Sequence, residues 1–104
     1  IDWNMPVKRI YDFIRGLSPS PAAWTELVQP DGTVVVLKIF ETEKMEQPHR
    51  FSPGTLQTDG KTYIRISGTD GWISVRALQL PGKKRLKTDE LLRGFKLTED
   101  YKVR

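Results

Sequence analysis

Three Asp-Gly pairs punctuate the middle of the chain and constrain its fold more than any other feature of the sequence. They lie at Asp31-Gly32, Asp59-Gly60 and Asp70-Gly71. Asp-Gly accepts the positive φ angles of tight turns, and between apolar runs it is a strong signal for an antiparallel hairpin. None of the pairs has the glycine spacing or the following helix of a nucleotide-binding loop, so we interpret all three as turns.

The segments around these turns have the composition of short β-strands. The run from Val34 to Phe40 is rich in β-branched residues, which is typical of a buried strand. In the predicted strand Trp72–Leu80, the apolar residues move from odd-numbered to even-numbered positions, and a β-bulge near Arg76-Ala77 would explain the change. Residues 43–53 are polar and contain two prolines, which predicts a long loop. The predicted strands are Ala22–Val28, Thr33–Thr42, Gly54–Thr58, Thr62–Ser67 and Trp72–Leu80.

Two helices are expected, one near each end of the chain. Residues 4–16 predict a helix that is capped by Asn4 and ended by Gly16. A short helix is predicted from Thr88, the expected N-cap, to about Arg93. The apolar stripe of the first helix consists of Val7, Ile10, Tyr11 and Ile14.

These elements together predict one mainly β domain that spans residues 1–104. Short strands leave exposed edges unless the sheet closes on itself. We therefore expect a small open OB-like Greek-key barrel of five to six antiparallel strands, with an N-terminal helix and a short C-terminal helix. No apolar run is long enough to span a membrane, and no signal peptide is recognised. The chain begins with Ile1 rather than Met, so we expect a fragment of a longer protein.

The sequence contains no recognisable catalytic or metal-binding motif. It has no Cys, which excludes thiol nucleophiles and thiolate metal sites. Its single histidine, His49, lies in a proline-rich loop with no companion motif, and we expect it to be solvated. Glu41 and Glu43 share one face of a predicted strand and are expected to be solvated charges that protect an edge. We therefore predict no catalytic residue and no metal site in this chain.

The three tryptophans are candidate stacking surfaces for nucleic-acid bases. Trp3 precedes the apolar helix and Trp24 opens a strand, so both are expected in the core. Trp72, beside the Asp70-Gly71 turn, is the best candidate for an exposed aromatic, although packing is the preferred interpretation there as well.

Positive charge is concentrated at the C-terminal end. The net charge is +4, yet residues 1–80 hold equal numbers of basic and acidic side chains, so the excess lies in residues 81–104. Lys83, Lys84, Arg85 and Lys87 fall in one segment before a predicted helix N-terminus, and Arg93 follows. Such a surface is suited to a phosphate backbone, with little readout of bases. The alternative is a solvated basic loop without a ligand.

Both ends of the chain also carry family-like motifs. The first set is Ile1-Asp2-Trp3-Asn4, Ile10-Tyr11, Ile14-Arg15-Gly16-Leu17, Pro19, Pro21 and Ala23-Trp24-Thr25. The second set is Leu78-Gln79-Leu80-Pro81-Gly82-Lys83-Lys84-Arg85-Leu86 and Leu91-Leu92-Arg93-Gly94. Together they resemble the C-terminal domain of methionyl-tRNA formyltransferase. Ala22 stands where that family commonly has Gly, and the middle of the chain carries little of its signature.

The resemblance implies a two-domain enzyme of translation initiation. Its N-terminal catalytic domain, which is absent from this chain, transfers the formyl group of 10-formyltetrahydrofolate to initiator methionyl-tRNA. This chain would be the accessory barrel that binds the tRNA, inactive by itself and without a cofactor, in a cytoplasmic monomer. The tRNA-binding role is carried over to Lys83, Lys84 and Arg85, with Lys87 and Arg93 as weaker extensions.

A second interpretation stays open. The same barrel also follows formyltransferase domains that act on nucleotide sugars or serve folate oxidation, and there it need not touch RNA. The chain would then be a structural domain that supports a catalytic partner, with the apolar helix as one packing surface.

Overall fold

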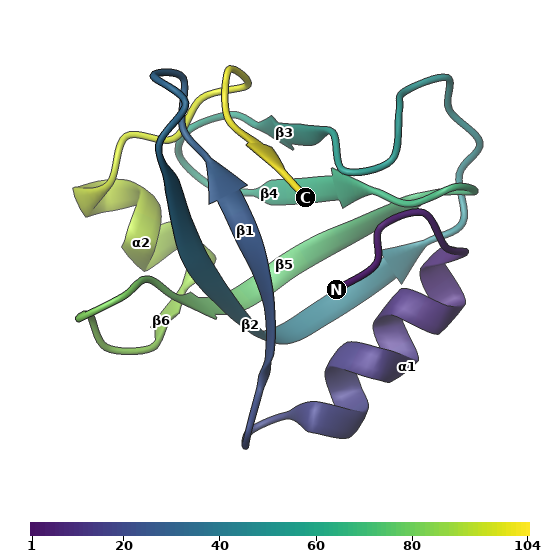
Figure 1. The fold of residues 1–104 in the computed structure, drawn as a ribbon, viewed down its shortest axis with the longest axis horizontal. Coiled ribbons are helices and arrows are strands. Elements are labelled where there is room, and N and C mark those ends of the chain that lie inside the picture. The colour runs from purple at the N-terminus through teal and green to yellow at the C-terminus, as the bar shows by residue number, and fades with distance from the viewer.

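A computed structural model describes all residues from 1 to 104 as a β-barrel with a helix at each side (Figure 1). The helices are α1 (Val7–Leu17) and α2 (Thr88–Gly94). The strands are β1 (Ala23–Val28), β2 (Val34–Met45), β3 (Leu56–Thr58), β4 (Ile64–Ser67), β5 (Trp72–Gln79), β6 (Leu86–Lys87) and β7 (Lys102–Val103). Neither helix has the length and apolarity that crossing a membrane requires.

All strand pairs are antiparallel, in the order β3-β4-β5-β2-β1-β7, with β6 paired to β5. The hairpin-connected strands β3, β4 and β5 are followed in space by β2, which is the Greek-key arrangement that the sequence predicts. The two ends of the path meet, because Thr55 bridges to Lys102 and the Val103 amide donates to the Gly54 carbonyl oxygen at 3.2 Å. The barrel is therefore nearly closed. The strands β6 and β7 account for the higher strand number, since two-residue strands leave no periodic signal.

The three Asp-Gly pairs occupy the turns between β1 and β2, β3 and β4, and β4 and β5. The predicted bulge is present between β2 and β5, where Ile39 pairs with Leu78 and Thr42 pairs with Val75. Arg76 has no partner within that irregular stretch. The strand β2 continues to Met45, so the long loop predicted from residue 43 begins later: the side chains of residues 43–45 are exposed while their backbone pairs with β5.

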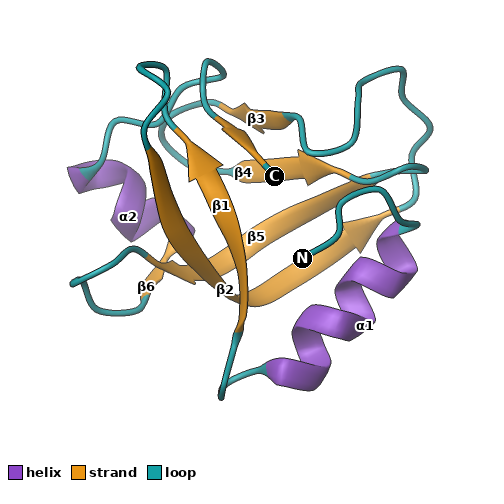
Figure 2. Cartoon of the chain, in the orientation of Figure 1, coloured by secondary structure: helices purple, strands orange, loops and turns teal.

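The core combines α1 with the inner faces of the strands (Figure 2). Val7, Ile10 and Ile14 are fully buried and lie in one cluster with apolar residues of both helices and of every strand except β6. The helix begins at Val7 rather than near Asn4, and Gly16 lies inside it. The predicted Asn4 cap is wrong, because the Val7 amide donates instead to the Oδ1 atom of a turn residue 63 positions away, Asp70, at 2.8 Å.

Of the three tryptophan predictions, the one for Trp24 is wrong. Trp3 is buried as expected, and its indole Nε1–H donates to Thr25 Oγ1 at 2.9 Å. Trp24, expected in the core, is 53% exposed. The packing preferred for Trp72 is confirmed: Trp72 is only 2% exposed, because the Arg65 guanidinium lies 4.2 Å from its ring centroid and the loop that contains His49 folds over it.

Candidate nucleic-acid interface

The predicted basic loop is the tip of a hairpin between β5 and β6. Pro81 and Gly82 occupy the central positions of a tight turn, closed by the Lys83 amide donating to the Leu80 carbonyl oxygen at 3.1 Å. Gly82 has φ of +71°, which suits the position after proline in a type II turn. The side chain of Gln79 donates to the Lys83 carbonyl oxygen at 2.7 Å. These two hydrogen bonds within the hairpin therefore fix the conformation of this basic turn, residues 80–85, at the end of β5.

Lys83 and Lys84 are the free cations of the basic turn. Both side chains are exposed, and neither is within ion-pair distance of an acidic group. No Asp or Glu occurs between Gly71 and Thr88, so no neighbour along the chain neutralises them. A pair of unpartnered ammonium groups on a fixed turn can contact phosphates without first breaking a salt bridge.

Arg85 and Arg93 are already partnered. The Arg85 guanidinium lies 2.7 Å from Glu41 Oε1 and 4.5 Å from the ring centroid of Phe40. Arg93 pairs with Asp89 at 3.3 Å, one turn earlier on α2. Both pairs are exposed, where an ion pair is worth well under about 1 kcal/mol, so a phosphate can displace the carboxylate. Glu41 is thus a salt-bridge partner rather than a free edge charge.

The start of α2 differs from the prediction. Lys87, not Thr88, is the residue before the first helical position, and its amide donates to Glu90 Oε1 at 3.0 Å. Thr88 is buried, and its hydroxyl donates to the carbonyl oxygen of Val75 at 2.5 Å, which ties α2 to β5. Asp89 and Glu90 occupy the first turn. The helix N-terminus is therefore occupied by its own carboxylates and does not add a free anion site.

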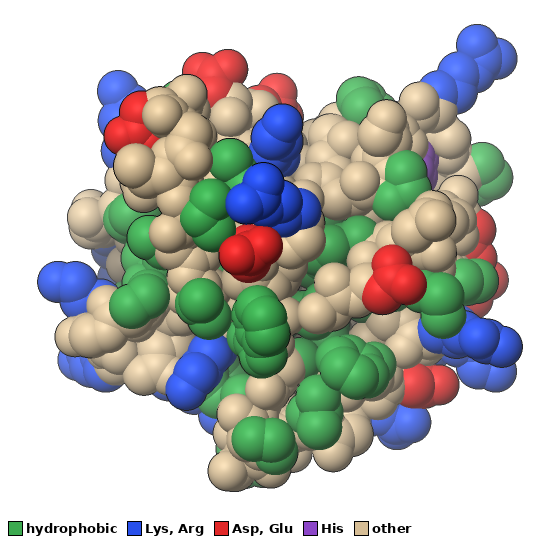
Figure 3. Space-filling view, in the orientation of Figure 1, with side chains coloured by type: hydrophobic (Ala, Val, Ile, Leu, Met, Phe, Trp, Pro, Cys, Tyr) green, Lys and Arg blue, Asp and Glu red, His purple; other side chains and the backbone are tan.

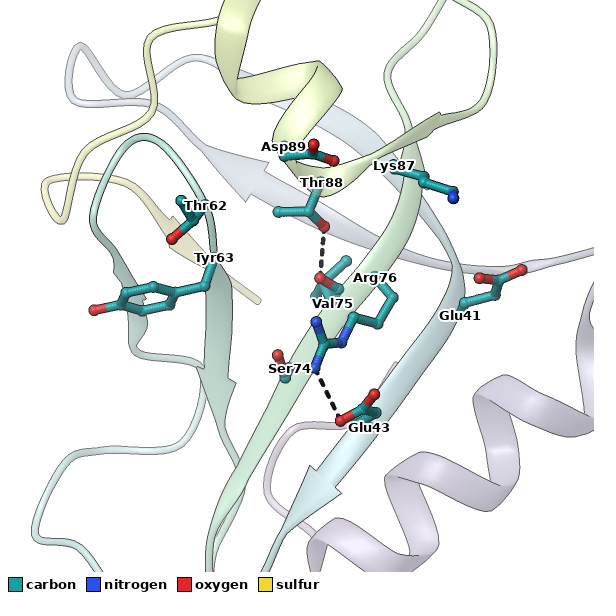
Figure 4. A pocket seen from close by; sticks show the side chains of 10 residues that line it. All are labelled: Glu41, Glu43, Thr62, Tyr63, Ser74, Val75, Arg76, Lys87, Thr88 and Asp89. Carbon is teal, nitrogen blue, oxygen red and sulfur yellow. Dashed lines mark hydrogen bonds and ion pairs between the residues drawn. The ribbon is translucent and has the colours of Figure 1, made fainter.

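A polar cavity of about 440 Å³ lies between β2, β5 and the start of α2 (Figure 4). Lys87 is one of its lining residues, and Arg76 crosses it to reach Glu43 Oε2 at 2.9 Å. The wall carries three carboxylates and two cations, so the cavity has no surplus of positive charge for a phosphate. The lining residues are Glu41, Glu43, Thr62, Tyr63, Ser74, Val75, Arg76, Lys87, Thr88 and Asp89.

Potential catalytic groups are not brought together. His49 Nε2 lies 2.9 Å from the carbonyl oxygen of Gly68 and 3.0 Å from that of Gly71, so the ring braces a turn instead of being solvated. No cluster of side chains has the composition of a metal site. The pKa values of Asp31 and Asp59 are lowered by the hydroxyl and amide groups of their own turns, those of Thr33 and Thr62 first. Both shifts report turn geometry rather than catalysis.

One surface feature was missed from the sequence. The exposed Trp24 of β1 stands directly across from Lys38 of β2, and Lys38 stands across from Gln79 of β5. The alternation along β1 could have predicted this exposure, because Ala23, Thr25 and Leu27 are buried and Trp24 lies on the opposite face of the strand. Figure 3 shows hydrophobic side chains gathered over β1 among scattered basic ones.

Comparison with known proteins identifies the family of this domain. The family model described as "Formyl transferase, C-terminal domain" matches residues 1–96. The chain belongs to this family. Proteins named "Methionyl-tRNA formyltransferase" are similar to it: one from Bacteroides fragilis (strain ATCC 25285) is 64% identical over 104 residues, and one from Bacteroides thetaiotaomicron is 65% identical over 103 residues.

A more distant relative of the same name, from Porphyromonas gingivalis, is 38% identical over 105 residues. The matches cover 99–100% of this formyltransferase C-terminal domain but 32% of each relative. The chain therefore spans about a third of the length of the curated relatives it matches. The resemblance drawn from the two terminal motifs is confirmed.

Proposed function

We propose that this domain binds tRNA on behalf of a methionyl-tRNA formyltransferase, and that a preceding N-terminal domain carries out formyl transfer from 10-formyltetrahydrofolate. The observation that carries the proposal is the pair of unpartnered lysines, Lys83 and Lys84, on the anchored turn. The relatives are named for methionyl-tRNA, and we propose its initiator form as the nucleic acid that this domain binds. A cytoplasmic monomer fits this role.

The five proposed phosphate contacts do not contribute equally. Lys83 and Lys84 meet the RNA first, because they are exposed and carry no competing carboxylate. Arg85 and Arg93 join by exchanging an exposed carboxylate for a phosphate, which limits their net gain. Lys87 lies at the rim of the mixed-charge cavity and contributes least. Contacts of this kind position an RNA and depend steeply on salt.

The test is a titration of unmodified tRNA into the 104-residue chain at several salt concentrations. Replacing both lysines (K83A/K84A) should flatten the plot of log K against log salt by up to about 1.8, at about 0.9 for each lost phosphate contact. The matched control is K8A/K61A, which removes the same charge from α1 and from the β3–β4 turn. Equal slopes for the two double variants contradict the proposal.

A specific observation favours a second role, the packing of the domain against its catalytic partner. The outer side of α1 carries a mostly apolar groove of about 430 Å³. Its apolar lining residues are Ile1, Met5, Ile10 and Phe13, of which Phe13 is 51% exposed, and its charged lining residues are Asp2, Arg9 and Asp12. If the domain served only to support its partner, Phe13→Ala would lower the stability of the full-length enzyme. The unaltered domain and its K83A/K84A variant would then bind tRNA equally weakly.

A separate experiment tests the proposal that one domain transfers the formyl group and the other binds the tRNA. The 104-residue chain should show no formyl transfer to methionyl-tRNA, because no nucleophile, base or metal site is assembled in it. In the full-length enzyme, K83A/K84A should raise KM for methionyl-tRNA and leave the affinity for 10-formyltetrahydrofolate unchanged. An unchanged KM for the tRNA would remove the basic turn from the proposal.

A further inference from the structure

A row of side chains crosses three strands on the outer face of the barrel. Trp24, Lys38 and Gln79 are successive cross-strand partners on β1, β2 and β5. Directly opposite residues in a sheet project to the same side, and neighbouring strands are about 4.8 Å apart. The row therefore spans about 10 Å from the indole to Gln79, whose amide holds the Lys83 carbonyl oxygen at 2.7 Å.

The indole at the end of the row has no partner in the domain. Trp24 is 53% exposed, whereas Trp3 and Trp72 are 4% and 2% exposed. It forms no aromatic pair and no cation–π contact, in contrast to Trp72. An exposed tryptophan on a strand that is paired to the sheet presents a flat apolar face at little entropic cost, which is the requirement of a stacking platform.

The charge around the indole is positive. Lys38 is exposed and forms no ion pair, and neither do Lys83 and Lys84 beyond the row. The one acidic residue on the outer face of β1, Glu26, is 3.3 Å from Arg104 Nε and is therefore neutralised. A groove of about 280 Å³ lies between Lys38 and the basic turn, with Val36 and Lys38 on one wall and residues 79–82 on the other.

We propose that Trp24 stacks on an unpaired base of the bound RNA, while Lys38 and the Lys83-Lys84 pair hold successive phosphates on one side of that nucleotide. This subsite rests on the proposed tRNA-binding function and adds to it a preference for a single-stranded element over a duplex. A base that is stacked within a helix offers no free face to the indole, whereas a phosphate is equally accessible in both forms.

An RNA segment suits this surface better than a protein segment does. The apolar part of the row consists of the Trp24 indole with Val36 nearby, and the unpaired Lys38 lies directly across from the indole. Alternating aromatic and cationic groups match the alternation of base and phosphate along a single strand.

The experiment measures binding of the 104-residue chain to a short single-stranded oligoribonucleotide of mixed sequence and to the blunt duplex of that strand, by fluorescence anisotropy. Trp24→Ala should weaken single-strand binding by about 5- to 150-fold, the range expected for the loss of one base–aromatic stack. Trp24→Phe should restore most of the affinity, and duplex binding should not change. Phe13→Ala is the matched control, since Phe13 is a similarly exposed aromatic on α1.

A second measurement uses the unaltered chain. Acrylamide should quench mainly the exposed Trp24, because the other two indoles are buried, and bound single strand should protect it while bound duplex should not. This readout holds even if a Trp24 variant folds poorly.

The outcomes distinguish the stacking subsite at Trp24 from the proposed tRNA-binding function. If the chain binds both RNAs and Trp24→Ala leaves single-strand affinity intact, or weakens both forms equally, the stacking subsite is overturned while the basic turn stands. If the chain binds neither RNA at low salt, the proposed function fails and the subsite with it, and Trp24 belongs to a protein interface.

Discussion

The contact between Asp70 and α1 gives the sharpest stability prediction. Asp70 Oδ1 accepts a hydrogen bond from the Val7 amide at 2.8 Å, which satisfies one of the free donors at the helix start. Loss of a helix cap costs about 0.5–2 kcal/mol, and loss of a carboxylate at the positive end of the helix costs about 0.3–1 kcal/mol more. For Asp70→Ala we therefore expect a loss of about 1–2 kcal/mol.

The consequence should be visible in thermal unfolding followed by circular dichroism. In a domain of this size about 1 kcal/mol lowers Tm by roughly 4–8 °C, so Asp70→Ala should lower it by roughly 5–15 °C. Asp70→Asn keeps an acceptor oxygen and should lose only the charge contribution. The control is Asp12→Ala, which removes the same charge from the exposed surface of α1. If Asp70→Ala unfolds at the same temperature as Asp12→Ala, the cap has no energetic role.

Two further predictions concern the turns. Gly71→Ala should destabilise the domain by at least about 1–3 kcal/mol in urea unfolding, because an added Cβ would overlap the backbone carbonyl oxygen of Met45; an unchanged midpoint would contradict this packing. The pKa of Asp59 is lowered, mainly by the Thr62 hydroxyl, so its contribution to stability is complete above the unfolded pKa near 3.8 and is lost as pH falls through the folded pKa. Asp59→Asn should therefore reduce the loss of stability on acidification below about pH 4, as measured by Tm against pH.

Local signals in the sequence were sufficient for the hairpins. The Asp-Gly pairs and the β-branched runs depend on a few adjacent residues, and so does the phase change that marks the bulge at Arg76. The Pro81-Gly82 turn is equally local, since proline and a positive-φ glycine in succession define it. These features positioned most strands and the basic turn correctly.

Contacts between residues that are far apart in the sequence could not be predicted from such local signals. The partner of Arg85 is Glu41, 44 positions away, and the cap of α1 comes from a turn 63 positions away. Trp72 lies on the outer side of its strand, as the alternation with Ile73 and Val75 implies, yet a loop from elsewhere in the chain covers it. Each of these features depends on how the sheet curves, which no short window of sequence contains.

The central claim is that the basic turn meets the RNA. The most direct measurement is an ¹H–¹⁵N NMR titration of the domain with unmodified tRNA at low salt. The account predicts that amide shifts cluster at Gly82–Arg85 and continue across β2 to Trp24 of β1, and that added salt reverses them. Shifts confined to the apolar groove around Phe13 on α1, or none at all, would contradict it.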